Sequence, residues 1–427
     1  MKVSVASTGE LTRTLSIEVP AETVSAEYER VYARLSKTTA LPGFRKGKVP
    51  RAILEPRLRD SLRQELLEQL LPKATQEAVV QQSLKTVGRP SIEGLEYNGQ
   101  GPLSFKVNVE VKPEFSLGVV EGLALQGPSV DVTEKEVDEQ ILGLRQRGAK
   151  EGAVKDGPAE QGDSVKVDFQ GFIDGKPFSG GNATDFALVL GRKQLIPGFE
   201  EQLIGAKAGE TRQVKVDFPA DYPAKDVAGK PSEFVVTVKE VRLLDLPTLD
   251  DAFAKTMGPE VESVAFLRDR LREALAEQKK RFRDQRLMDI AAEELLKRHS
   301  FAVPASMIDA EAHAMEQGEM GRLASQGMEL NGPEGHSALH KALREPAEKR
   351  ARLSLVLEKI AESHKIEAGD DDFEAEMRRI ASQIRGSAAD AARYIRQTGR
   401  EHGVRAQIRE RKALEWVVDK AKVSAFA

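Results

Sequence analysis

Residues 162–178 read GDSVKVDFQGFIDGKPF, a pair of strand patterns separated by an Asp-Gly dipeptide. Apolar and polar residues alternate from Ser164 to Phe169, which is typical of a strand with one buried face. Asp174-Gly175 favours a tight hairpin turn, because these two residue types tolerate the positive φ angles that such a turn requires. The same alternation returns in residues 234–241. This region is therefore predicted to form a small antiparallel β domain.

The segments on either side of this β domain have a different character. Residues 114–150 form a connector in which Thr133 and Glu136 have the spacing of a helix-capping box. Residues 247–427 are charged and almost wholly helical in pattern, with narrow apolar stripes. After a first long helix over 262–298, further helices are expected at about 305–330, 338–366, 371–384, 388–398 and 402–423. The β domain, assigned to residues 151–246, is thus predicted to be inserted between two parts of one helical domain.

Residues 1–113 are predicted to form a separate N-terminal domain. An alternating strand over 11–19 is followed by helical spacing over 24–35 and again over 53–71. Uninterrupted alternation over 103–111 predicts a closing strand. This order of elements is typical of a small α+β domain. The predicted fold class is therefore a multidomain α+β chain with an α+β first domain, an inserted antiparallel β domain and a mostly helical remainder.

The composition limits the function classes. The chain has 427 residues, enough for several domains, and its net charge of −4 excludes a generally basic nucleic-acid-binding protein. It has no cysteine, which excludes disulfides and thiolate metal sites and is typical of a reducing compartment. The first residues lack the apolar core of a signal peptide, and no segment has the apolar length of a membrane span. We expect a soluble, cytoplasmic protein without membrane contact.

The loop between the two predicted N-terminal helices contains the most specific motif, GFRKGKVP at residues 43–50. Glycines allow a tight exposed turn, basic side chains can neutralise phosphates, and an exposed Phe44 can pack on a base or on an apolar protein patch. The alternative is an ordinary solvated loop with Phe44 folded into its own domain. The residues alone leave both interpretations open.

The motif resembles the ribosome-docking signature of the trigger factor family, a GFRxGKxP loop between two helices. The resemblance implies contact with the large ribosomal subunit, its protein and its rRNA, near the polypeptide exit tunnel. It assigns the main contacts to Phe44, Arg45 and Lys46. Supporting roles fall to Gly43, Gly47 and Lys48. It further implies nascent unfolded polypeptides as clients, a homodimer off the ribosome, and roles in protein export and cell division.

The β domain resembles FKBP-type prolyl isomerases over roughly residues 160–245. Several blocks agree in order: the hairpin around Asp174-Gly175, the stretch LGRKQLIPGFE at 190–200, and a last strand near Phe234. The resemblance implies an aromatic proline pocket lined by Phe169, Phe178, Phe186, Leu195, Ile196, Phe199, Tyr222 and Phe234. The Ile196 backbone N–H would donate to the substrate. Aromatic residues at strand spacing are often core residues, so each ring is equally open to a core or a pocket role.

Three other features of the sequence resemble known kinds of site. His336 and His340 are four residues apart, as in a helical metal pair, but the sequence offers no clear third ligand, so no metal and no cofactor is expected. Gly180-Gly181-Asn182 is expected to be a turn rather than a phosphate loop. Four methionines fall in one helical stretch and suit either promiscuous binding or ordinary helix packing. They are Met307, Met315, Met320 and Met328.

The leading hypothesis is a chaperone of nascent chains with an isomerase domain, partly bound to ribosomes. One alternative is a free prolyl isomerase whose helical regions recruit folded clients. Another is a structural adaptor whose isomerase domain is inactive. Ribosome co-sedimentation separates the first alternative from the leading hypothesis, and acceleration of proline-limited refolding separates the second.

Overall fold

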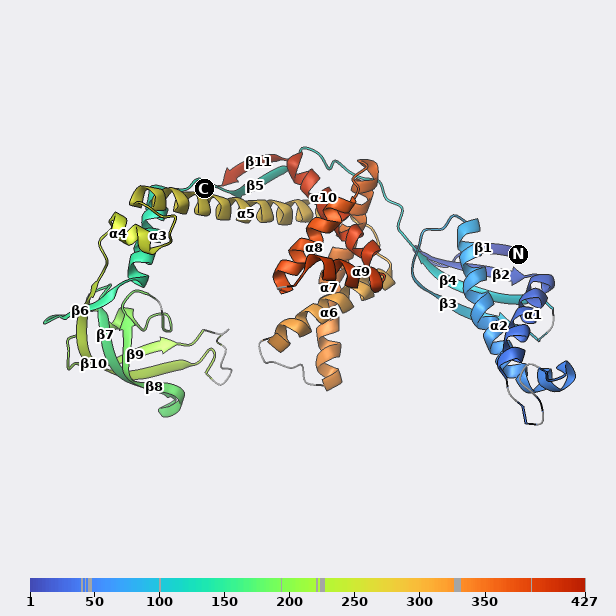
Figure 1. The fold of residues 1–427 in the computed structure, drawn as a ribbon, viewed down its shortest axis with the longest axis horizontal. Helices are drawn as coiled ribbons and strands as arrows, with labels where there is room; N and C mark the ends of the chain where they lie inside the picture. Colours follow the sequence, from blue (N-terminus) through green and yellow to red (C-terminus); the bar gives the residue numbers. More distant parts are fainter. Residues whose placement is uncertain are drawn as a thin grey trace. The chain divides into compact units, whose positions relative to one another are not determined.

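The computed structural model describes residues 1–39, 41–42, 44, 48–99, 101–192, 194–219, 222, 227–325, 332–384 and 386–426. The described chain divides into two compact units. The first combines Met1–Pro128 with Asp284–Ala427, and the second is Ser129–Arg283. Figure 1 labels the helices and strands of both units. The multidomain α+β class predicted from the sequence is confirmed: the described residues form a four-stranded, a five-stranded and a two-stranded sheet, and helices dominate the C-terminal part.

The N-terminal domain is a four-stranded antiparallel sheet covered by two helices. Its elements are β1 (Lys2–Ser7), β2 (Thr12–Val19), α1 (Ala21–Thr38), α2 (Arg51–Gln81), β3 (Thr86–Glu96) and β4 (Leu103–Val111), with strand order β1-β2-β4-β3. Leu15 and Ile17 of β2 are buried with Leu66 of α2 in one core, which confirms the alternating pattern and the helical stripe. β1 and β3 were not predicted, because most of their residues are exposed and carry no clear apolar alternation.

The second unit contains a five-stranded sheet. Its elements are β6 (Lys150–Val154), β7 (Ser164–Ile173), β8 (Lys176–Val189), the short 3₁₀ helix η1 (Glu201–Leu203), β9 (Thr211–Asp217) and β10 (Pro231–Asp245). The strand order is β6-β10-β7-β8, and β9 also pairs with β10. Asp174 and Gly175 have φ angles of 52° and 74°, and Ile173 pairs with Lys176. The predicted two-residue hairpin with positive φ at both turn positions is therefore confirmed.

The turn predicted at Gly180-Gly181-Asn182 is wrong, because these residues lie within β8. The strand continues through them with irregular register against β7, where Asn182 pairs with Gln170. Glycine and asparagine are typical of turns, but glycine in a strand also marks a bulge or a close approach of another group. The group here is Phe178: a Cβ built on Gly181 would lie 2.6 Å from its ring.

Three helical segments complete the second unit. They are α3 (Glu134–Arg147), α4 (Asp251–Thr256) and the first half of α5 (Val264–Arg298). The capping box at the start of α3 is confirmed: Thr133 Oγ1 accepts from the Glu136 backbone N–H, and Glu136 accepts from the Thr133 N–H. Lys279 of α5 bonds the same Glu136 at 2.7 Å. This ion pair holds α5 against the beginning of α3.

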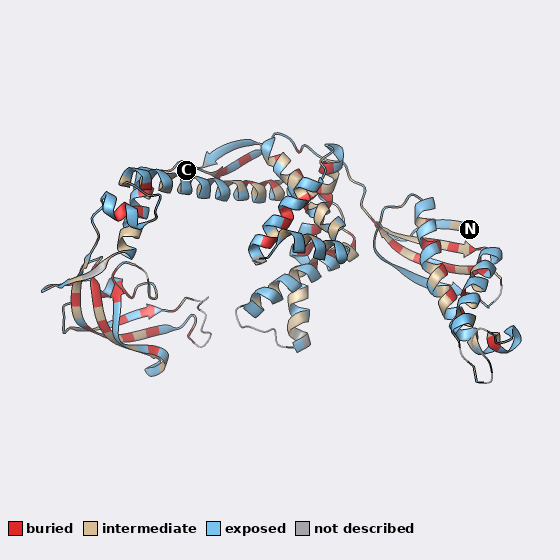
Figure 2. Cartoon of the chain, in the orientation of Figure 1, coloured by how far each residue is buried: buried red, intermediate tan, exposed pale blue. Residues whose placement is uncertain are grey.

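The helical part of the first unit is built from α6 to α10 with the end of α5. The helices are α6 (Ala305–Ser325), α7 (Gly332–Ser363), α8 (Asp370–Ile384), α9 (Ala388–Gln397) and α10 (Glu401–Asp419). α7 begins six residues before its predicted range, and the helix predicted over 402–423 ends at Asp419, so that residues 422 and 423 belong to a strand. One core joins Leu295 of α5, Ile360 of α7 and Val417 of α10. β11 (Lys422–Phe426) was not predicted and pairs in parallel with β5 (Ala124–Pro128). Figure 2 shows how buried positions alternate along the strands but form stripes on the helices.

Candidate functional site

The aromatic residues singled out in the sequence come together on one side of the second unit's sheet. Phe169 of β7 contacts Phe186 of β8, Phe199 and Phe234 of β10, with ring centroids 5.8, 5.8 and 6.0 Å apart. Phe178 of β8 contacts Phe234 at 5.9 Å. All these pairs meet edge to face, the arrangement that aromatic quadrupoles favour. The structure thus brings residues from three strands and one loop into a single ring cluster.

The rings of this cluster differ in how far they are exposed to solvent. Phe199 and Phe234 are buried, at 2% and 4% exposure, and belong to the domain core. Phe169 and Phe178 are half-buried beside that core. Phe186 and Tyr222 are exposed, at 36% and 38%. The cluster therefore combines two rings of the domain core with two rings that solvent reaches.

Phe218, for which the sequence predicts no role, is part of the same cluster. It is buried, and its ring lies 5.8 Å from Phe178 and 4.8 Å from Tyr222. Phe218 therefore connects the exposed Tyr222 to the buried part of the cluster. The sequence could have predicted that Phe218 is buried, because it continues the alternation of Val214 and Val216 directly after β9.

Two glycines make room for these rings. A Cβ built on Gly171 would lie 2.6 Å from Phe234 and 2.7 Å from Phe178. Gly181 stands equally close to the Phe178 ring. Real Cβ atoms do not approach other heavy atoms so closely, so any larger residue at either position would displace a ring of the candidate pocket.

Glu200 holds the loop that carries Leu195 and Ile196. Its buried carboxylate accepts hydrogen bonds from the backbone N–H groups of Gly191, Gln194 and Leu195, at 2.8, 2.6 and 3.3 Å. Leu195 and Ile196 are half-buried against the aromatic core. Among the described residues, none accepts a hydrogen bond from the Ile196 N–H, so this donor is available to a ligand. Glu200 was missed in the sequence because its role depends on a loop conformation.

A charged network behind the sheet holds the segment that carries Phe186. The Asp185 N–H donates to Asp168 at 2.7 Å, and Lys239 bonds both carboxylates at 2.9 and 3.0 Å. The hydrogen bond from Lys239 lowers the pKa of Asp185, and Lys166 acts in the same direction. The hydrogen bond from the Asp185 N–H is the main reason that the pKa of Asp168 is lowered. Asp185 has φ 54°, so this network stabilises an unusual backbone conformation next to Phe186.

The second candidate site is the connection between α1 and α2. Phe44 is 41% exposed there, which contradicts the alternative that it is folded into its own domain, and Lys48 is also exposed. Gly43, Arg45, Lys46 and Gly47 lie outside the described residues. Arg51 is bound within the domain: it pairs with Glu29 at 2.7 Å and with Glu55 at 2.8 Å. It joins the two helices and is not part of the exposed tip.

Comparison with known proteins gives consistent matches along the whole chain. The family model for the bacterial trigger factor protein matches residues 1–144, and the model for its C-terminus matches residues 263–419. The model for FKBP-type peptidyl-prolyl cis-trans isomerase matches residues 155–239. The trigger factor of Shouchella clausii is 36% identical, over 97% of both chains. The chain belongs to the trigger factor family. The trigger factor of Lysinibacillus sphaericus is 39% identical, over 96% of this chain and 97% of its own.

The chain is therefore a ribosome-associated chaperone with peptidyl-prolyl cis-trans isomerase activity. A solved trigger factor chaperone structure has the same fold, with a TM-score of 0.50 over 98% of this chain and 99% of its own, at 21% identity. In the described part of the trigger factor, no helix has the length and apolar character needed to cross a membrane.

The two histidines considered as a metal pair are engaged with a carboxylate. The Nδ1 atoms of His336 and His340 on α7 lie 3.1 and 3.3 Å from the two oxygens of Glu316 on α6. The hydrogen bond with His336 is the main reason that the pKa of Glu316 is lowered, and the hydrogen bond with His340 acts in the same direction. Within the described ranges, no group of three His, Cys, Asp or Glu side chains is arranged to hold a metal ion.

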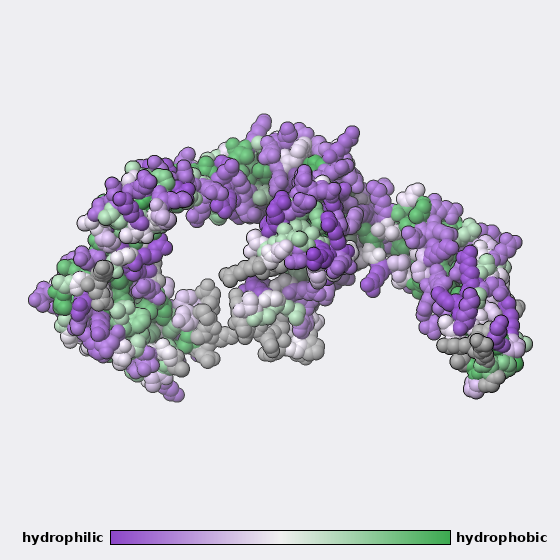
Figure 3. Space-filling model, viewed as in Figure 1, coloured by the Kyte–Doolittle hydropathy of each residue, from purple (hydrophilic) through white to green (hydrophobic). Residues whose placement is uncertain are grey.

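The methionines that the structure describes in the stretch from Met307 to Met328 differ in burial, and Met307 is half-buried. Met315 is half-buried against Ile308 and Ala347, as a packing residue. Met320 is 38% exposed, and Met328 lies outside the described residues. Figure 3 shows the helical part as a largely hydrophilic surface with separate hydrophobic spots.

Proposed function

We propose that the exposed tip between α1 and α2 attaches this chain to the large ribosomal subunit beside the polypeptide exit tunnel. The observation that carries the proposal is the exposure of Phe44 at the end of a helical hairpin, next to a strongly basic stretch. The assigned roles are those of the motif: Phe44, Arg45 and Lys46 make the contacts, while Gly43, Gly47 and Lys48 support the loop. Phosphates and acidic protein groups would bind the cations, and an apolar patch would receive the phenyl ring.

Co-sedimentation with purified large ribosomal subunits tests this attachment. The triple variant Phe44→Ala, Arg45→Ala, Lys46→Ala should lose binding, and binding of the unchanged chain should weaken strongly with added salt. A matched control is Lys73→Ala with Val80→Ala, which removes an exposed cation and an exposed apolar residue near the other end of α2, about 35–45 Å away. Equal binding by the triple variant and the control would refute the proposal.

We further propose that the aromatic cluster is the isomerase pocket and that it acts without a nucleophile, metal or cofactor. The barrier to rotation about a prolyl bond is loss of amide resonance, about 18–20 kcal/mol. The twisted amide is less polar than the planar one, so a dry aromatic pocket stabilises the transition state relative to the ground state. Phe169, Phe199 and Phe234 would hold the proline ring. The Ile196 N–H would donate to the substrate backbone and orient it.

Acceleration of a proline-limited refolding reaction tests the pocket. Gly181→Val should abolish acceleration, because the added side chain displaces the Phe178 ring, whereas Gly143→Ala should not, since nothing lies within 4 Å of that glycine. Aggregation suppression by both variants should match the unchanged chain. Full acceleration by Gly181→Val would refute this assignment of the pocket.

The proposal extends to the finer features that the resemblance implies. The clients would be nascent unfolded polypeptides, bound by the scattered apolar spots of the helical part, since small separated patches can hold many sequences weakly. The domain limits would be 1–113 for attachment, 151–246 for the isomerase, and 114–150 with 247–427 for the helical part. A cytoplasmic location, a homodimer off the ribosome, and roles in protein export and cell division rest on the resemblance alone.

A further inference from the structure

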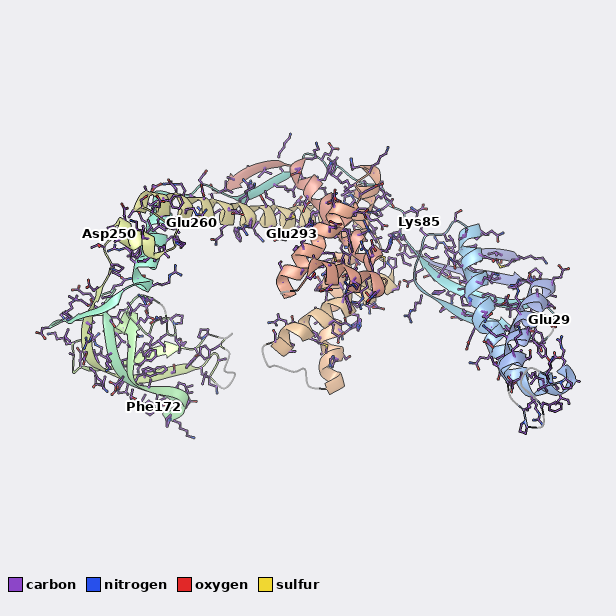
Figure 4. The ribbon with its side chains drawn as sticks, in the orientation of Figure 1. Glu29, Lys85, Phe172, Asp250, Glu260 and Glu293 are labelled. Carbon is purple, nitrogen blue, oxygen red and sulfur yellow. The ribbon has the colours of Figure 1, made fainter. Side chains whose placement is uncertain are left out.

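β5 and β11 form a small parallel sheet of their own in the first unit. Within the described part of the chain, no third strand pairs with either of them. Their register is regular, with five consecutive residue pairs that begin at Lys422 and Ala124. Figures 1 and 4 show the two strands beside α5, on which Figure 4 labels Glu293. Because an isolated pair of parallel strands is only marginally stable, contacts elsewhere in the fold must hold it in place.

The helical core holds β5 in place. Leu125 is fully buried and belongs to one cluster with Leu287 of α5 and Val417 of α10. Leu123, directly before the strand, is buried in the same cluster, and Gly127 is also buried. Among the described residues, no side chain of β11 belongs to this cluster. The position of β5 therefore depends on apolar contacts that β11 does not supply.

β11 is held by its backbone. The Lys422 N–H donates to the carbonyl oxygen of Leu123 at 2.8 Å, and the ladder with β5 continues from there. The strand has four described side chains that are all exposed, those of Lys422, Val423, Ser424 and Ala425. Even the apolar Val423 is 46% exposed. Release of β11 would thus expose little additional apolar surface and would cost mainly the backbone pairing.

The edge of β5 that β11 covers recognises a backbone rather than a sequence. In a parallel pair, the N–H and C=O groups of one strand bond those of the other at even spacing, whatever the side chains are. Since the described side chains of β11 are exposed, another extended segment can make the same hydrogen bonds at this edge. Proline is the exception, because it has no N–H. Such a site suits a chaperone, whose clients share a backbone and little else.

The sequence of β11 shows which segments fit this edge. It reads KVSAF over residues 422–426, with a single charged residue, a β-branched residue and an aromatic residue. β-branched and aromatic residues are enriched in strands. In a polypeptide that has not yet folded, segments of this kind are unpaired and accessible. A strand-forming segment of an unfolded client is therefore the competitor of β11 for the edge of β5.

We propose that the edge of β5 binds an extended, strand-forming segment of an unfolded polypeptide, and that β11 occupies this edge until a client displaces it. The proposal rests on the proposed binding of unfolded clients and adds a backbone-directed mode to the apolar spots of the helical part. A client held by those spots competes well, because its local concentration is high. Folded proteins, whose strands are already paired, and proline-rich segments are rejected.

A reversible cross-link between the two strands tests the proposal in the full-length chain. The chain has no cysteine, so Gln126→Cys with Ser424→Cys introduces one pair, at exposed positions that face each other in the register. Paired strands lie about 4.8 Å apart, which a disulfide can span. The probe is a fluorescent peptide that contains the sequence KVSAF twice. The oxidised variant should bind it about five-fold more weakly than the reduced variant, because the locked β11 can no longer be displaced.

A matched control is Thr211→Cys with Thr237→Cys. These residues pair between β9 and β10, so their disulfide joins two strands of the isomerase sheet and leaves β5 and β11 free. The control should bind the peptide equally in its oxidised and reduced forms. Equal weakening of the control on oxidation would assign the loss to the treatment and would overturn the proposed site.

Hydrogen exchange shows whether the peptide takes the place of β11. When the peptide is added to the unchanged chain, the amides of residues 422–426 should lose protection, while those of 124–127 should keep theirs. Unchanged protection at 422–426, or equal binding by the oxidised and reduced forms of the β5–β11 variant, would overturn the site. If the unchanged chain failed to suppress aggregation of any unfolded protein, the proposed binding of clients would itself be refuted.

Discussion

The sheet of the isomerase domain and the helical part of the first unit are stabilised in different ways. The sheet domain has one continuous core, in which Phe199 and Phe234 pack with valines of β7, β9 and β10 and with Leu188 of β8. The helical part has several separate clusters instead, such as the one around Phe373 and the one around Ile308. Charged contacts join its helices: Lys412 of α10 pairs with Asp372 of α8, and two arginine side chains stack on Phe373.

This difference predicts how each region responds to damage. In a continuous core, the loss of one ring leaves a cavity that many neighbours line, so the whole domain is destabilised. In a set of separate clusters, the loss of one contact affects mainly the helices that share it. A rigid core suits a pocket that must present a fixed shape, and separate clusters suit a surface that adapts to many sequences.

The largest expected effect is from Phe199→Ala. This change should destabilise the isomerase domain by roughly 3–5 kcal/mol and abolish isomerase activity, because it opens a cavity in the continuous core. Trp416, the single tryptophan, lies in the helical core and reports on that region alone. Urea unfolding followed by Trp416 fluorescence should be unchanged, while limited proteolysis should cleave the isomerase domain at lower urea. Phe199→Leu is the conservative control. If Phe199→Ala shifted the Trp416 transition as far as it shifts the proteolysis of the isomerase domain, the separation of the two regions would be contradicted.

A smaller effect is expected from Glu376→Gln on α8. Glu376 is buried and accepts from Arg379 at 2.5 Å and from Arg411 of α10 at 2.8 Å. The bond from Arg379 is the main cause that lowers its pKa to about 2. Removing the charge should cost about 2 kcal/mol and shift the Trp416 transition, because Arg411 and Trp416 lie on the same helix. Glu374→Gln, an exposed neighbour on α8, is the control.

The pH dependence of this variant follows from the sign of the pKa shift. A carboxylate whose folded pKa is lowered stabilises the fold above its unfolded pKa, and the stabilisation disappears as pH falls through the folded value. The difference in stability between Glu376→Gln and the unchanged chain should therefore be constant above about pH 5 and shrink from there toward pH 2. A difference that grows on acidification would contradict the assignment.

The smallest effect, and one of opposite sign, is expected from Glu410→Gln on α10. Burial raises the pKa of Glu410, and the nearby Glu311 and Glu358 act in the same direction against a hydrogen bond from Ser354 at 2.7 Å. A raised folded pKa means that stability falls as pH rises above the unfolded value. Glutamine should thus be neutral or stabilise by up to about 1 kcal/mol at pH 7, measured by Trp416 fluorescence. Clear destabilisation at pH 7 and not at pH 4 would show that the charge is required.

The sequence predicted those elements whose own residues specify them. The alternation of β2, β4 and β7, the Asp174-Gly175 turn and the capping box at Thr133 all depend on local chemistry. β1, β3 and β11 were missed because they are exposed or pair with distant segments, and no local pattern records a distant partner. In the same way, the sequence identified the aromatic residues of the cluster, but only the fold shows which of them are buried and which are exposed. Glu200 binds the backbone of a folded loop, and Gly181 leaves room for the Phe178 ring. A sequence pattern records neither the loop conformation nor the position of the ring.

The parallel pairing of β5 with β11 constrains the order in which this chain can fold during its own synthesis. Val423 pairs with Leu125, so the two partners are separated by 298 residues of the 427-residue chain. At about 5–20 residues per second, Leu125 waits on the order of 15–60 s for its partner strand. The N-terminal sheet and the isomerase sheet have all their strands within residues 2–111 and 150–245 and can close long before then. The strand pair of β5 and β11 therefore forms after both of these sheets can have closed, and it is among the last parts of the first unit to assemble.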